Sequence, residues 1–355
     1  MSHKPTLAVV GATGTVGSVM LELLSIREDV WGEIRLIASP RTAGKRLICR
    51  DEELIVRAPD PGVFEGVEVA LFDVPDGVSS ALAPMVAQQG AVVVDNSSAF
   101  RMDPQVPLIV PQVNAGQVRR RTKGIIANPN STTLTMMDVI GALHRRWGLT
   151  ELVVSSYQSA SGAGQAGVDR LYDELQVVAG NRTLGRTAGD VRRQIAAQLG
   201  EKTPFDAPLA LNVVPWAGAR HEEGWSTEEL KVRNESRKIL GLPGLKVSAT
   251  CVRVPVVAGH SLAIHAVFQD RVDVEEARQT LIEAPGVVLL DDPDAREFPT
   301  PVDVAGSDPT FVGRLRQSGD FPNALDMFVC GDNLRKGAAL NTIEIAELVA
   351  AELSS

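Results

Sequence analysis

The chain has 355 residues, of which 44% are hydrophobic and only 4% aromatic, and its formal net charge is −9 at pH 7. This length is sufficient for two domains, each with its own core. The negative charge argues against a nucleic-acid partner, because the one dense basic stretch, Arg119 to Arg121 with Lys123, fits a solvated surface. Abundant aliphatic residues favour buried parallel strands covered by helices.

Three cysteines, Cys49, Cys251 and Cys330, are widely spaced and follow neither a metal-binding nor a disulfide pattern. We therefore expect free thiols in a reducing cytoplasm, and no metal site. No signal-peptide pattern precedes the first apolar run, and no apolar segment is long enough to cross a bilayer, so no membrane partner is expected.

The first 130 residues alternate short apolar runs with helical patterns. The expected strands are 6–11, 33–39, 67–74, 91–96 and 124–128, with helices near 16–26, 77–89 and 114–120. Strands that alternate with helices predict an α/β fold with a parallel, doubly wound sheet.

The pattern changes at residue 131. We expect helices at 132–148, 164–178, 187–200, 226–239 and 274–283, and strand-like runs at 149–161, 246–257 and 260–272. They predict an α+β domain with a mixed or antiparallel sheet, over residues 131–331. The amphipathic segment 333–353 predicts a last helix, so that residues 332–355 pack back on the first domain, 1–130.

A glycine turn follows the first strand in the sequence "VVGATGTVGSVMLELL". Gly11, Gly14 and Gly17 give a tight turn in which the backbone can approach a pyrophosphate at the N-terminus of a helix. This context predicts a Rossmann-type dinucleotide site. The residues between the glycines are expected to contact the cofactor as well: Thr13, Thr15 and Val16.

The end of the second strand indicates which dinucleotide binds. It reads "LIASPRTAGKRL", with Ser39, Arg41 and Thr42 but no Asp or Glu to bind a ribose 2′-hydroxyl. A hydroxyl and a guanidinium suit a 2′-phosphate, so the sequence predicts NADP.

Six polar segments carry the candidate chemistry. They are "DNSSAFR" (95–101), "NPNS" (128–131), "SSYQSASGAGQAG" (155–167), "STEELK" (226–231), "CVRVPVVAGHS" (251–261) and "DNLRKGAALN" (332–341). The first two follow strands, so their polar residues should lie at the carboxyl edge of the sheet, where ligands bind in open α/β folds.

With these motifs, the chain resembles the aspartate-semialdehyde dehydrogenase family over nearly its whole length. The resemblance implies an oxidoreductase that interconverts aspartate 4-semialdehyde, phosphate and NADP with 4-aspartyl phosphate and NADPH, in the biosynthesis of lysine, methionine and threonine. It also implies a homodimer or homotetramer. The N-acetylglutamyl-phosphate reductases share this chemistry but match "SSYQSASGAG" and "VRVPVVAGHS" less well.

The resemblance assigns roles to the site residues. Ser131 stands at the position of the nucleophilic cysteine, Gln158 would orient the substrate, and His260 would be the acid/base. The residues implied to hold the substrate are Arg253 and Glu228 at its amino-acid end, and Arg101, Asn130 and Lys231 at phosphate. Further cofactor contacts are implied for Asn96, Ser161, Gly162 and Asn333.

The chemistry of these side chains agrees with those roles. A substrate with charges at both ends needs cationic groups at both ends, and an arginine such as Arg253 can bind a carboxylate through two hydrogen bonds. Glu228 can pair with an α-ammonium group. The ordinary titration range of His260 suits proton transfer near neutrality.

Ser131 is the main departure from the family. A thiol at a helix N-terminus ionises near neutral pH, whereas a serine hydroxyl needs a general base already in place. Three interpretations follow: an engineered replacement that traps ligands, a natural non-catalytic relative that binds ligand, or a new serine–histidine hydrolytic pair. Serine as a simple helix cap fits the first two.

Two smaller departures accompany it. The family often has a Ser-Ala-Gly-Gly-like turn after the third strand, where this chain reads "DVPDGVSS" (73–80). Contacts from this turn to the cofactor are therefore left open. Gln112 stands in "VPQVN", where an acidic residue is common.

Overall fold

The computed structural model describes residues 3–354, which divide into two compact units. Unit 1 contains residues 3–137, 234–243 and 334–354, and unit 2 contains residues 138–233 and 244–333. Two helices contribute residues to both units: α4 (Ser131–Trp147) and α7 (Thr227–Leu240).

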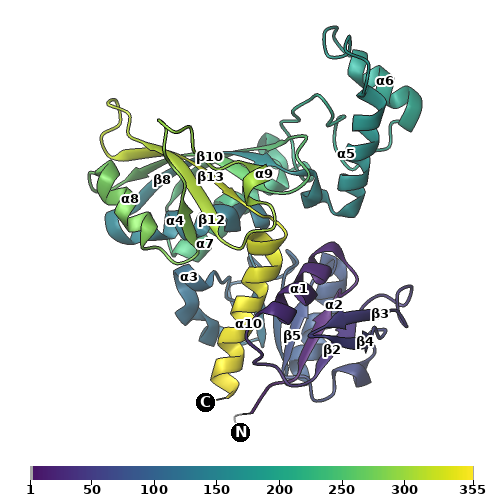
Figure 1. The fold of residues 1–355 in the computed structure, drawn as a ribbon. Helices are drawn as coiled ribbons and strands as arrows, with labels where there is room; N and C mark the ends of the chain where they lie inside the picture. The colour runs from purple at the N-terminus through teal and green to yellow at the C-terminus, as the bar shows by residue number, and fades with distance from the viewer. Residues whose placement is uncertain (1–2, 355) are drawn as a thin grey trace. The chain divides into compact units, whose positions relative to one another are not determined.

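Unit 1 is built on a sheet of five parallel strands in the order β2-β1-β5-β6-β7 (Figure 1). The strands are β1 (Leu7–Val10), β2 (Ile34–Ile37), β5 (Val69–Phe72), β6 (Val92–Asp95) and β7 (Ile125–Ala127). Every residue of β1, β5 and β7 is buried, which explains their continuous apolar sequences.

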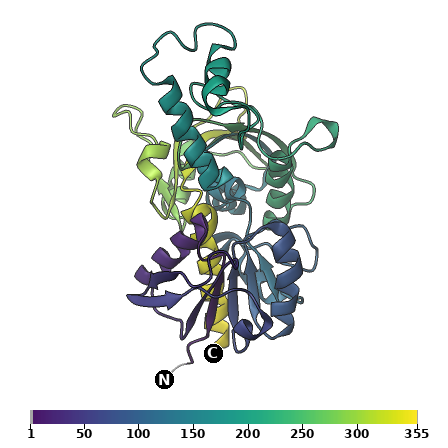
Figure 2. The same cartoon turned by 90° about the vertical axis from the view of Figure 1, so that its right-hand side faces the viewer.

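Helices cover this sheet on both faces. They are α1 (Thr15–Ile26), α2 (Asp76–Gln88), α3 (Pro111–Asn114) and α10 (Leu340–Leu353), with 3₁₀ turns η1 (Pro61–Phe64) and η2 (Ala115–Arg120). Figure 2 shows α1 and α2 on opposite sides of the strands, as right-handed crossovers in opposite directions require. The largest apolar core of unit 1 joins α1, the sheet and α10.

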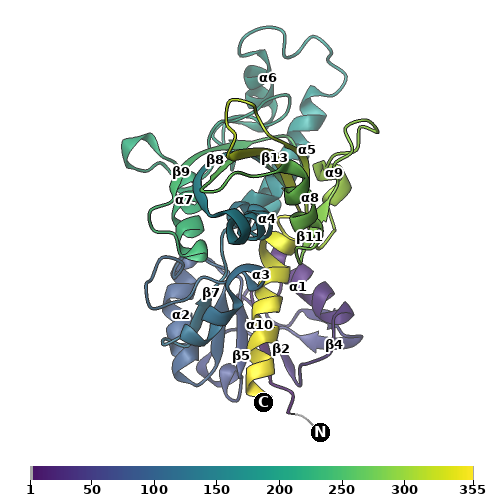
Figure 3. The ribbon, with the colours of Figure 1, turned by 90° about the vertical axis from the view of Figure 1, so that its left-hand side faces the viewer.

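The last helix is preceded by a π-helical turn, η5 (Arg335–Ala339). The helix α10 runs along the strands of unit 1 (Figure 3). It buries Leu340, Ile343, Ile345 and Val349 in the core of this unit. The C-terminal segment thus completes the apolar face that the parallel sheet exposes.

Unit 2 is built on a six-stranded mixed sheet in the order β11-β12-β13-β10-β8-β9. Its strands are β8 (Leu149–Gln158), β9 (Lys246–Arg253), β10 (His260–Phe268), β11 (Val287–Leu289), β12 (Thr310–Arg316) and β13 (Ala324–Gly331). The β10–β13, β10–β8 and β12–β13 pairs are antiparallel, whereas the β8–β9 and β11–β12 pairs are parallel.

Unit 2 contains four further helices. They are α5 (Gln165–Val178), α6 (Asp190–Leu199), α8 (Val274–Ile282) and α9 (Pro301–Val304), with 3₁₀ turns η3 (Ala160–Ala163) and η4 (Glu222–Gly224). In Figure 1, α5 and α6 extend beyond the mixed sheet as a helical pair. Within residues 3–354, no helix is both long and apolar enough to span a bilayer.

The fold class predicted from the sequence is confirmed: a parallel Rossmann-like sheet and a separate mixed sheet. Three details differ. A hairpin of β3 (Arg46–Cys49) and β4 (Glu52–Ile55) was not predicted. The segment expected as a helix at 114–120 is a 3₁₀ turn, and the helix expected at 187–200 begins only at Asp190.

Candidate active site

The glycine turn of unit 1 is tightly packed against neighbouring backbone. Gly11 has φ +99°, and a Cβ there would lie 2.0 Å from the carbonyl oxygen of Asp73. A Cβ at Gly17 would lie 2.3 Å from the carbonyl oxygen of Gly11. Side chains are therefore excluded where the N-terminus of α1 faces the sheet edge, and this bare backbone fits the phosphates of a dinucleotide.

The loop after β2 lies next to this turn. The hydroxyl of Thr42 is 3.2 Å from that of Thr13 and donates to the carbonyl oxygen of Ser39 at 3.2 Å. Ser39 and Arg41 are exposed. The three residues predicted to select a 2′-phosphate thus follow β2 directly beside the glycine turn.

Ser131 is the first residue of α4, as the sequence predicted for a helix N-terminus. The cap, however, is the preceding residue: the side-chain oxygen of Asn130 accepts a hydrogen bond from the Thr132 N–H at 3.0 Å. The interpretation of Ser131 as a helix cap is therefore wrong. Position 131 is only partly exposed and lies in the first turn, where the helix dipole favours a negative charge.

Glu235 is a site residue that the sequence analysis missed. Its buried carboxylate accepts a hydrogen bond from the Asn130 N–H at 2.7 Å and pairs with the Arg101 guanidinium at 3.2 Å. Arg101 also donates to the Asn96 carbonyl at 2.7 Å. The spacing of Glu228, Lys231 and Glu235 along one helical face is the sequence signal that could have revealed it.

Lys238 holds the segment that follows Arg101. Its ammonium group donates to the carbonyl oxygens of Arg101, Asp103 and Val106 at 2.6, 2.7 and 2.8 Å. Burial lowers the pKa of this lysine. Three buried carbonyls and one cation fix the loop that carries Arg101, so the guanidinium is held in one place.

In unit 2, Arg253 and His260 both contact Ser159. Arg253 ends β9 and donates to the Ser159 carbonyl at 2.9 Å, and the Ser159 N–H donates to Nδ1 of His260 at 3.1 Å. A Cβ on Gly162 would lie 2.5 Å from Arg253 Nη1 and 3.2 Å from His260 Cε1. Gly162 is therefore required so that the guanidinium and the imidazole can pack against the turn.

The hydrogen bonds of His260 define its protonation. Because an amide N–H can only donate, Nδ1 is an acceptor and the neutral ring carries its proton on Nε2. Burial, and then the nearby Arg253, lowers the pKa of His260 to about 3. The sequence-based expectation of titration near neutrality is therefore wrong for this structure, since the desolvation of a fully buried ring has no signature in the sequence.

Gln158, Glu228 and Lys231 form a chain of polar contacts. The Gln158 amide donates to one oxygen of Glu228 at 3.4 Å, and the Lys231 ammonium pairs with the other oxygen at 2.6 Å. Glu228 also acts on Arg253, whose pKa is lowered by burial and raised by this carboxylate. One carboxylate thus links the Gln158 amide to two cations.

Asn333 ties the turn after β8 to the turn before β10. Its side-chain oxygen accepts hydrogen bonds from the Ser159 hydroxyl at 2.9 Å and from the Gly259 N–H at 2.9 Å. Its amide donates to the Ser161 hydroxyl at 3.0 Å. Ser161 and Asn333, both predicted to contact the cofactor, therefore have a structural role beside Ser159 and His260.

None of the three cysteines resembles a catalytic thiol. All are buried free thiols. Burial raises the pKa of Cys49, and raises the pKa of Cys251 to about 12 and that of Cys330 to about 11. Each therefore stays protonated at neutral pH.

Gln112 has a clear local function in unit 1. Its side-chain amide donates to Glu344 at 3.0 Å, and its carbonyl oxygen accepts from the buried Lys336 ammonium at 2.9 Å. Glu344 is itself 3.4 Å from Lys336. Glu344 thus supplies the negative charge beside Lys336 that the neutral Gln112 does not.

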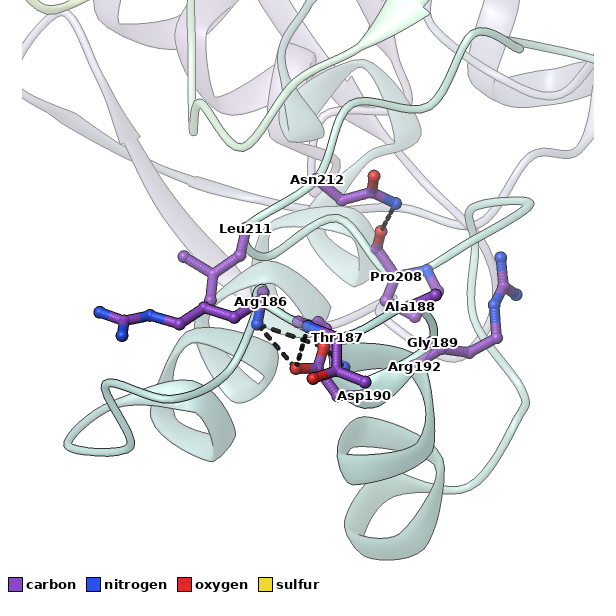
Figure 4. Close-up of a pocket in the computed structure, with 11 residues that line it drawn as sticks. Arg186, Thr187, Ala188, Gly189, Asp190, Arg192, Pro208, Leu211 and Asn212 are labelled. Atoms are coloured by element: carbon purple, nitrogen blue, oxygen red, sulfur yellow. Dashed lines mark hydrogen bonds between the residues drawn. The ribbon is translucent and has the colours of Figure 1, made fainter.

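One cavity of about 390 Å³ lies elsewhere in unit 2, between the 185–192 segment and Pro208, Leu211 and Asn212 (Figure 4). Backbone N–H groups that face it already donate to the carboxylate of Asp190. No predicted site residue lines it. Across the described residues, no cluster of His, Cys, Asp or Glu has the arrangement of a metal site.

The structure thus gathers the predicted residues into two groups. In unit 1, Asn130 and Arg101 contact Glu235, Ser131 follows Asn130 directly, and the glycine turn lies at the same sheet. In unit 2, five residues with assigned substrate or catalytic roles meet around the ends of β8, β9 and β10: Gln158, Glu228, Lys231, Arg253 and His260.

Two known protein families match this chain. Residues 6–121 match the family described as "Semialdehyde dehydrogenase, NAD binding domain", and residues 140–336 match "Semialdehyde dehydrogenase, dimerisation domain". The fold and both matches define a nicotinamide-dependent semialdehyde dehydrogenase, an oxidoreductase.

Individual relatives indicate which kind of semialdehyde dehydrogenase this chain is similar to. The aspartate-semialdehyde dehydrogenase of Streptomyces akiyoshiensis is 47% identical over 349 residues, which cover 98% of this chain and 99% of the relative. The aspartate-semialdehyde dehydrogenase II of Vibrio cholerae, solved in complex with ASA, superposes with a TM-score of 0.90 at 34% identity and covers 99% of both chains. The enzyme of Candida albicans, solved with NADP, has a TM-score of 0.74 at 25% identity and covers 99% of this chain and 100% of that chain.

The chain therefore belongs to the aspartate-semialdehyde dehydrogenase family, whose enzymes act in aspartate-family amino-acid biosynthesis.

Proposed function

We propose that this chain binds NADP, aspartate 4-semialdehyde and phosphate as a dehydrogenase of its family does, and that Ser131 makes the chemical step slow. The observation that carries the proposal is the complete set of polar contacts around Arg253 and His260 in unit 2. Glu228 and His260 are buried and Arg253 is half-buried, and polar groups are costly to bury, so we infer that they are kept in order to bind a ligand.

The charged side chains of the site complement the charged groups at the two ends of the substrate. Arg253 can hold the α-carboxylate through two hydrogen bonds, and Glu228 can pair with the α-ammonium group. Lys231, Arg101 and Asn130 are the proposed phosphate ligands. Support for the aldehyde comes from the Vibrio cholerae relative, which was solved in complex with ASA.

In this arrangement His260 acts as a hydrogen-bond donor. Its Nδ1 accepts from Ser159, so Nε2–H is the group that can stabilise the oxyanion formed when a nucleophile attacks the aldehyde carbon. When bound, the nicotinamide of NADP would accept a hydride from that carbon. Gln158, fixed by Glu228, holds the reacting carbon in place.

A serine is a poor nucleophile under these conditions. The Ser131 hydroxyl must lose its proton to attack, yet His260 is in its donor form and so supplies no base. A thiol at the N-terminus of α4 would ionise without a base, since the helix dipole lowers its pKa. The oxygen ester formed by serine also transfers its acyl group to phosphate more slowly than a thioester does.

NADP is the proposed dinucleotide, and Arg41 with Ser39 and Thr42 is proposed to bind its 2′-phosphate. The Candida albicans relative was solved with NADP, which supports this choice. Replacing Arg41 with Ala should weaken NADP binding about tenfold and leave NAD binding almost unchanged, because one charge-assisted contact is lost. Equal loss for both dinucleotides, measured by calorimetry, would refute the role of Arg41.

The second candidate function is a catalytically silent homologue that binds ligand and serves as a regulatory or partner subunit. Ser131 favours it, because a serine hydroxyl without a general base is a poor nucleophile. A homodimer through unit 2 is part of both candidates. On β8, Val153 and Tyr157 are 46% and 37% exposed, so this face of the sheet offers apolar surface to a second copy.

The test compares this chain with Ser131→Cys and Ser131→Ala for NADPH formation from aspartate semialdehyde, NADP and phosphate. We expect Ser131→Cys to be at least about a thousandfold faster than the parent chain, because only the thiolate is missing. Ser131→Ala should be no faster than the parent. An inactive Ser131→Cys that still binds both ligands would favour the silent homologue.

A further inference from the structure

The turn after β5 carries a carboxylate at the glycine turn. Asp73 follows β5 directly, and its N–H donates to the Val10 carbonyl at 2.8 Å. Its Oδ2 would lie 3.6 Å from a Cβ built on Gly14, and the Gly17 N–H interacts favourably with the same carboxylate. A negative charge therefore lies against the N-terminus of α1, where the pyrophosphate of a dinucleotide is expected.

The neighbours of Asp73 do not neutralise it. Asn96 donates to its Oδ1 at 2.9 Å. Asp95, at the end of the adjacent strand, is the charged group that acts on it, and this second carboxylate is repulsive. The helix α1 brings no charged side chain to the turn, since its first residues are Thr15, Val16, Gly17 and Ser18.

The next acidic residue is engaged elsewhere. Asp76 begins α2, and its carboxylate accepts hydrogen bonds from the Ser98 N–H at 2.8 Å and from the Ser98 hydroxyl. Asp95 is buried and is held by the hydroxyls of Ser79 and Ser97 at 2.8 and 2.7 Å. Of the three carboxylates in this region, Asp73 is the one that faces the glycine turn.

We propose that Asp73 weakens dinucleotide binding by competing with the pyrophosphate for the N-terminus of α1, so that binding is coupled to uptake of a proton at this carboxylate. The inference rests on the proposed position of the cofactor at the glycine turn. Two anions that share one helix terminus repel each other, and protonation of the carboxylate removes the repulsion.

The electrostatics of the site determine whether the affinity for the dinucleotide rises or falls with pH. Burial raises the pKa of Asp73 above its ordinary value, and Asp95 raises it further. A bound pyrophosphate raises it again, because it is a second negative neighbour. The complex therefore binds more protons than the free protein, and affinity increases as the pH falls toward the pKa of this group.

The test is calorimetric titration of NADP⁺ into the full chain, into Asp73→Asn and into Asp51→Asn, at pH 8.0 and pH 5.5. Asparagine keeps the shape of Asp73 and can still accept from Asn96. Asp51 is exposed in the turn between β3 and β4, so its substitution makes the same change in net charge without touching the glycine turn. Asp73→Ser is a second variant, in case the amide distorts the turn.

At pH 8.0, Asp73→Asn should bind NADP⁺ about tenfold more tightly than the parent, and Asp51→Asn should match the parent. At pH 5.5 the difference should be smaller than at pH 8.0, because a carboxyl group with a raised pKa takes up its proton earlier as the pH falls. Titrations in two buffers of different ionisation heat should show more proton uptake by the parent than by Asp73→Asn.

Equal affinity of the parent, Asp73→Asn and Asp73→Ser at both pH values would overturn this inference alone. Absence of NADP⁺ binding in all variants would overturn the position of the cofactor, and the inference with it. Because calorimetry measures binding rather than turnover, the slow chemistry of Ser131 does not affect the result.

Discussion

On the proposed assignments, the two units differ in how closely they match the residues that the resemblance implies. In unit 2, Gln158, Glu228, Lys231, Arg253 and His260 have the expected residue types and contact one another or shared neighbours. In unit 1, three positions differ from that expectation: Ser131 at the start of α4, Asp73 at the glycine turn, and Gln112. The residues assigned to the substrate's amino-acid end are thus of the expected types, while those assigned to attack on the carbonyl and to the cofactor's phosphates are not.

This difference predicts that substrate binding and the chemical step are affected separately. On the proposed assignments, Ser131 lacks the acidity of a thiol of similar shape, and Asp73 places a carboxylate at the glycine turn. Gln112 is compensated by Glu344 and leaves the buried Lys336 paired. A protein with such changes should recognise the substrate normally and be limited by the nucleophile and by cofactor affinity.

The largest effect expected in unit 2 is that of Arg253→Lys, made in the Ser131→Cys background. Lysine keeps the charge but loses the two-pronged contact with a carboxylate and the bond to the Ser159 carbonyl. We expect kcat/KM for aspartate semialdehyde to fall about a hundredfold. Arg271→Lys, at an exposed position of the same unit, is the control and should be unchanged. A loss below threefold for Arg253→Lys would show that unit 2 does not bind the substrate as proposed.

A smaller effect is expected from Gly162→Ala, in the same background. The new Cβ would lie 2.5 Å from Arg253 Nη1, so the guanidinium must move, and the His260 ring at 3.2 Å must shift with it. The rate should fall about tenfold, with a modest loss of thermal stability. Gly319→Ala is the matched control, because nothing lies within 4 Å of a Cβ there. Steady-state kinetics that do not distinguish the two variants would contradict the packing around Arg253.

The smallest effect concerns the pH dependence of stability. The pKa of His260 is about 3 in the folded chain, against about 6.5 when unfolded, so only the unfolded state gains this proton as the pH falls below 6.5. Stability is therefore lost between pH 6.5 and 3. From pH 7 to 5, the parent should lose about 4 °C more in Tm than His260→Asn. Parallel Tm profiles of the two proteins would show that His260 is not buried as a neutral ring.

Much of the fold followed from the sequence, for reasons that particular elements show. Buried strands such as β1 and β5 are continuous apolar runs, and α1 begins directly after a glycine turn, so periodicity locates both. The β3–β4 hairpin escaped prediction because its residues are mostly exposed and give no clear alternation.

The site was harder to predict where burial or long-range contacts decide it. Motifs located Arg253 and His260, but the low pKa of His260 depends on complete desolvation in the folded chain. Glu235 was missed because its partners, Asn130 and Arg101, are more than a hundred residues away in the sequence. The assignment of the cap was displaced by one residue, since both Asn130 and Ser131 are residue types that cap helices.

We propose that unit 2 is an intact substrate site and that the chain lacks only a sulfur nucleophile. A single-turnover experiment tests this: Ser131→Cys is mixed with aspartate semialdehyde and NADP in the absence of phosphate, and NADPH is followed. We expect a burst of about one NADPH per chain, because the acyl group then remains on the thiol, and no burst from Ser131→Ala. A chain that binds both ligands yet gives no burst with cysteine at position 131 would contradict it.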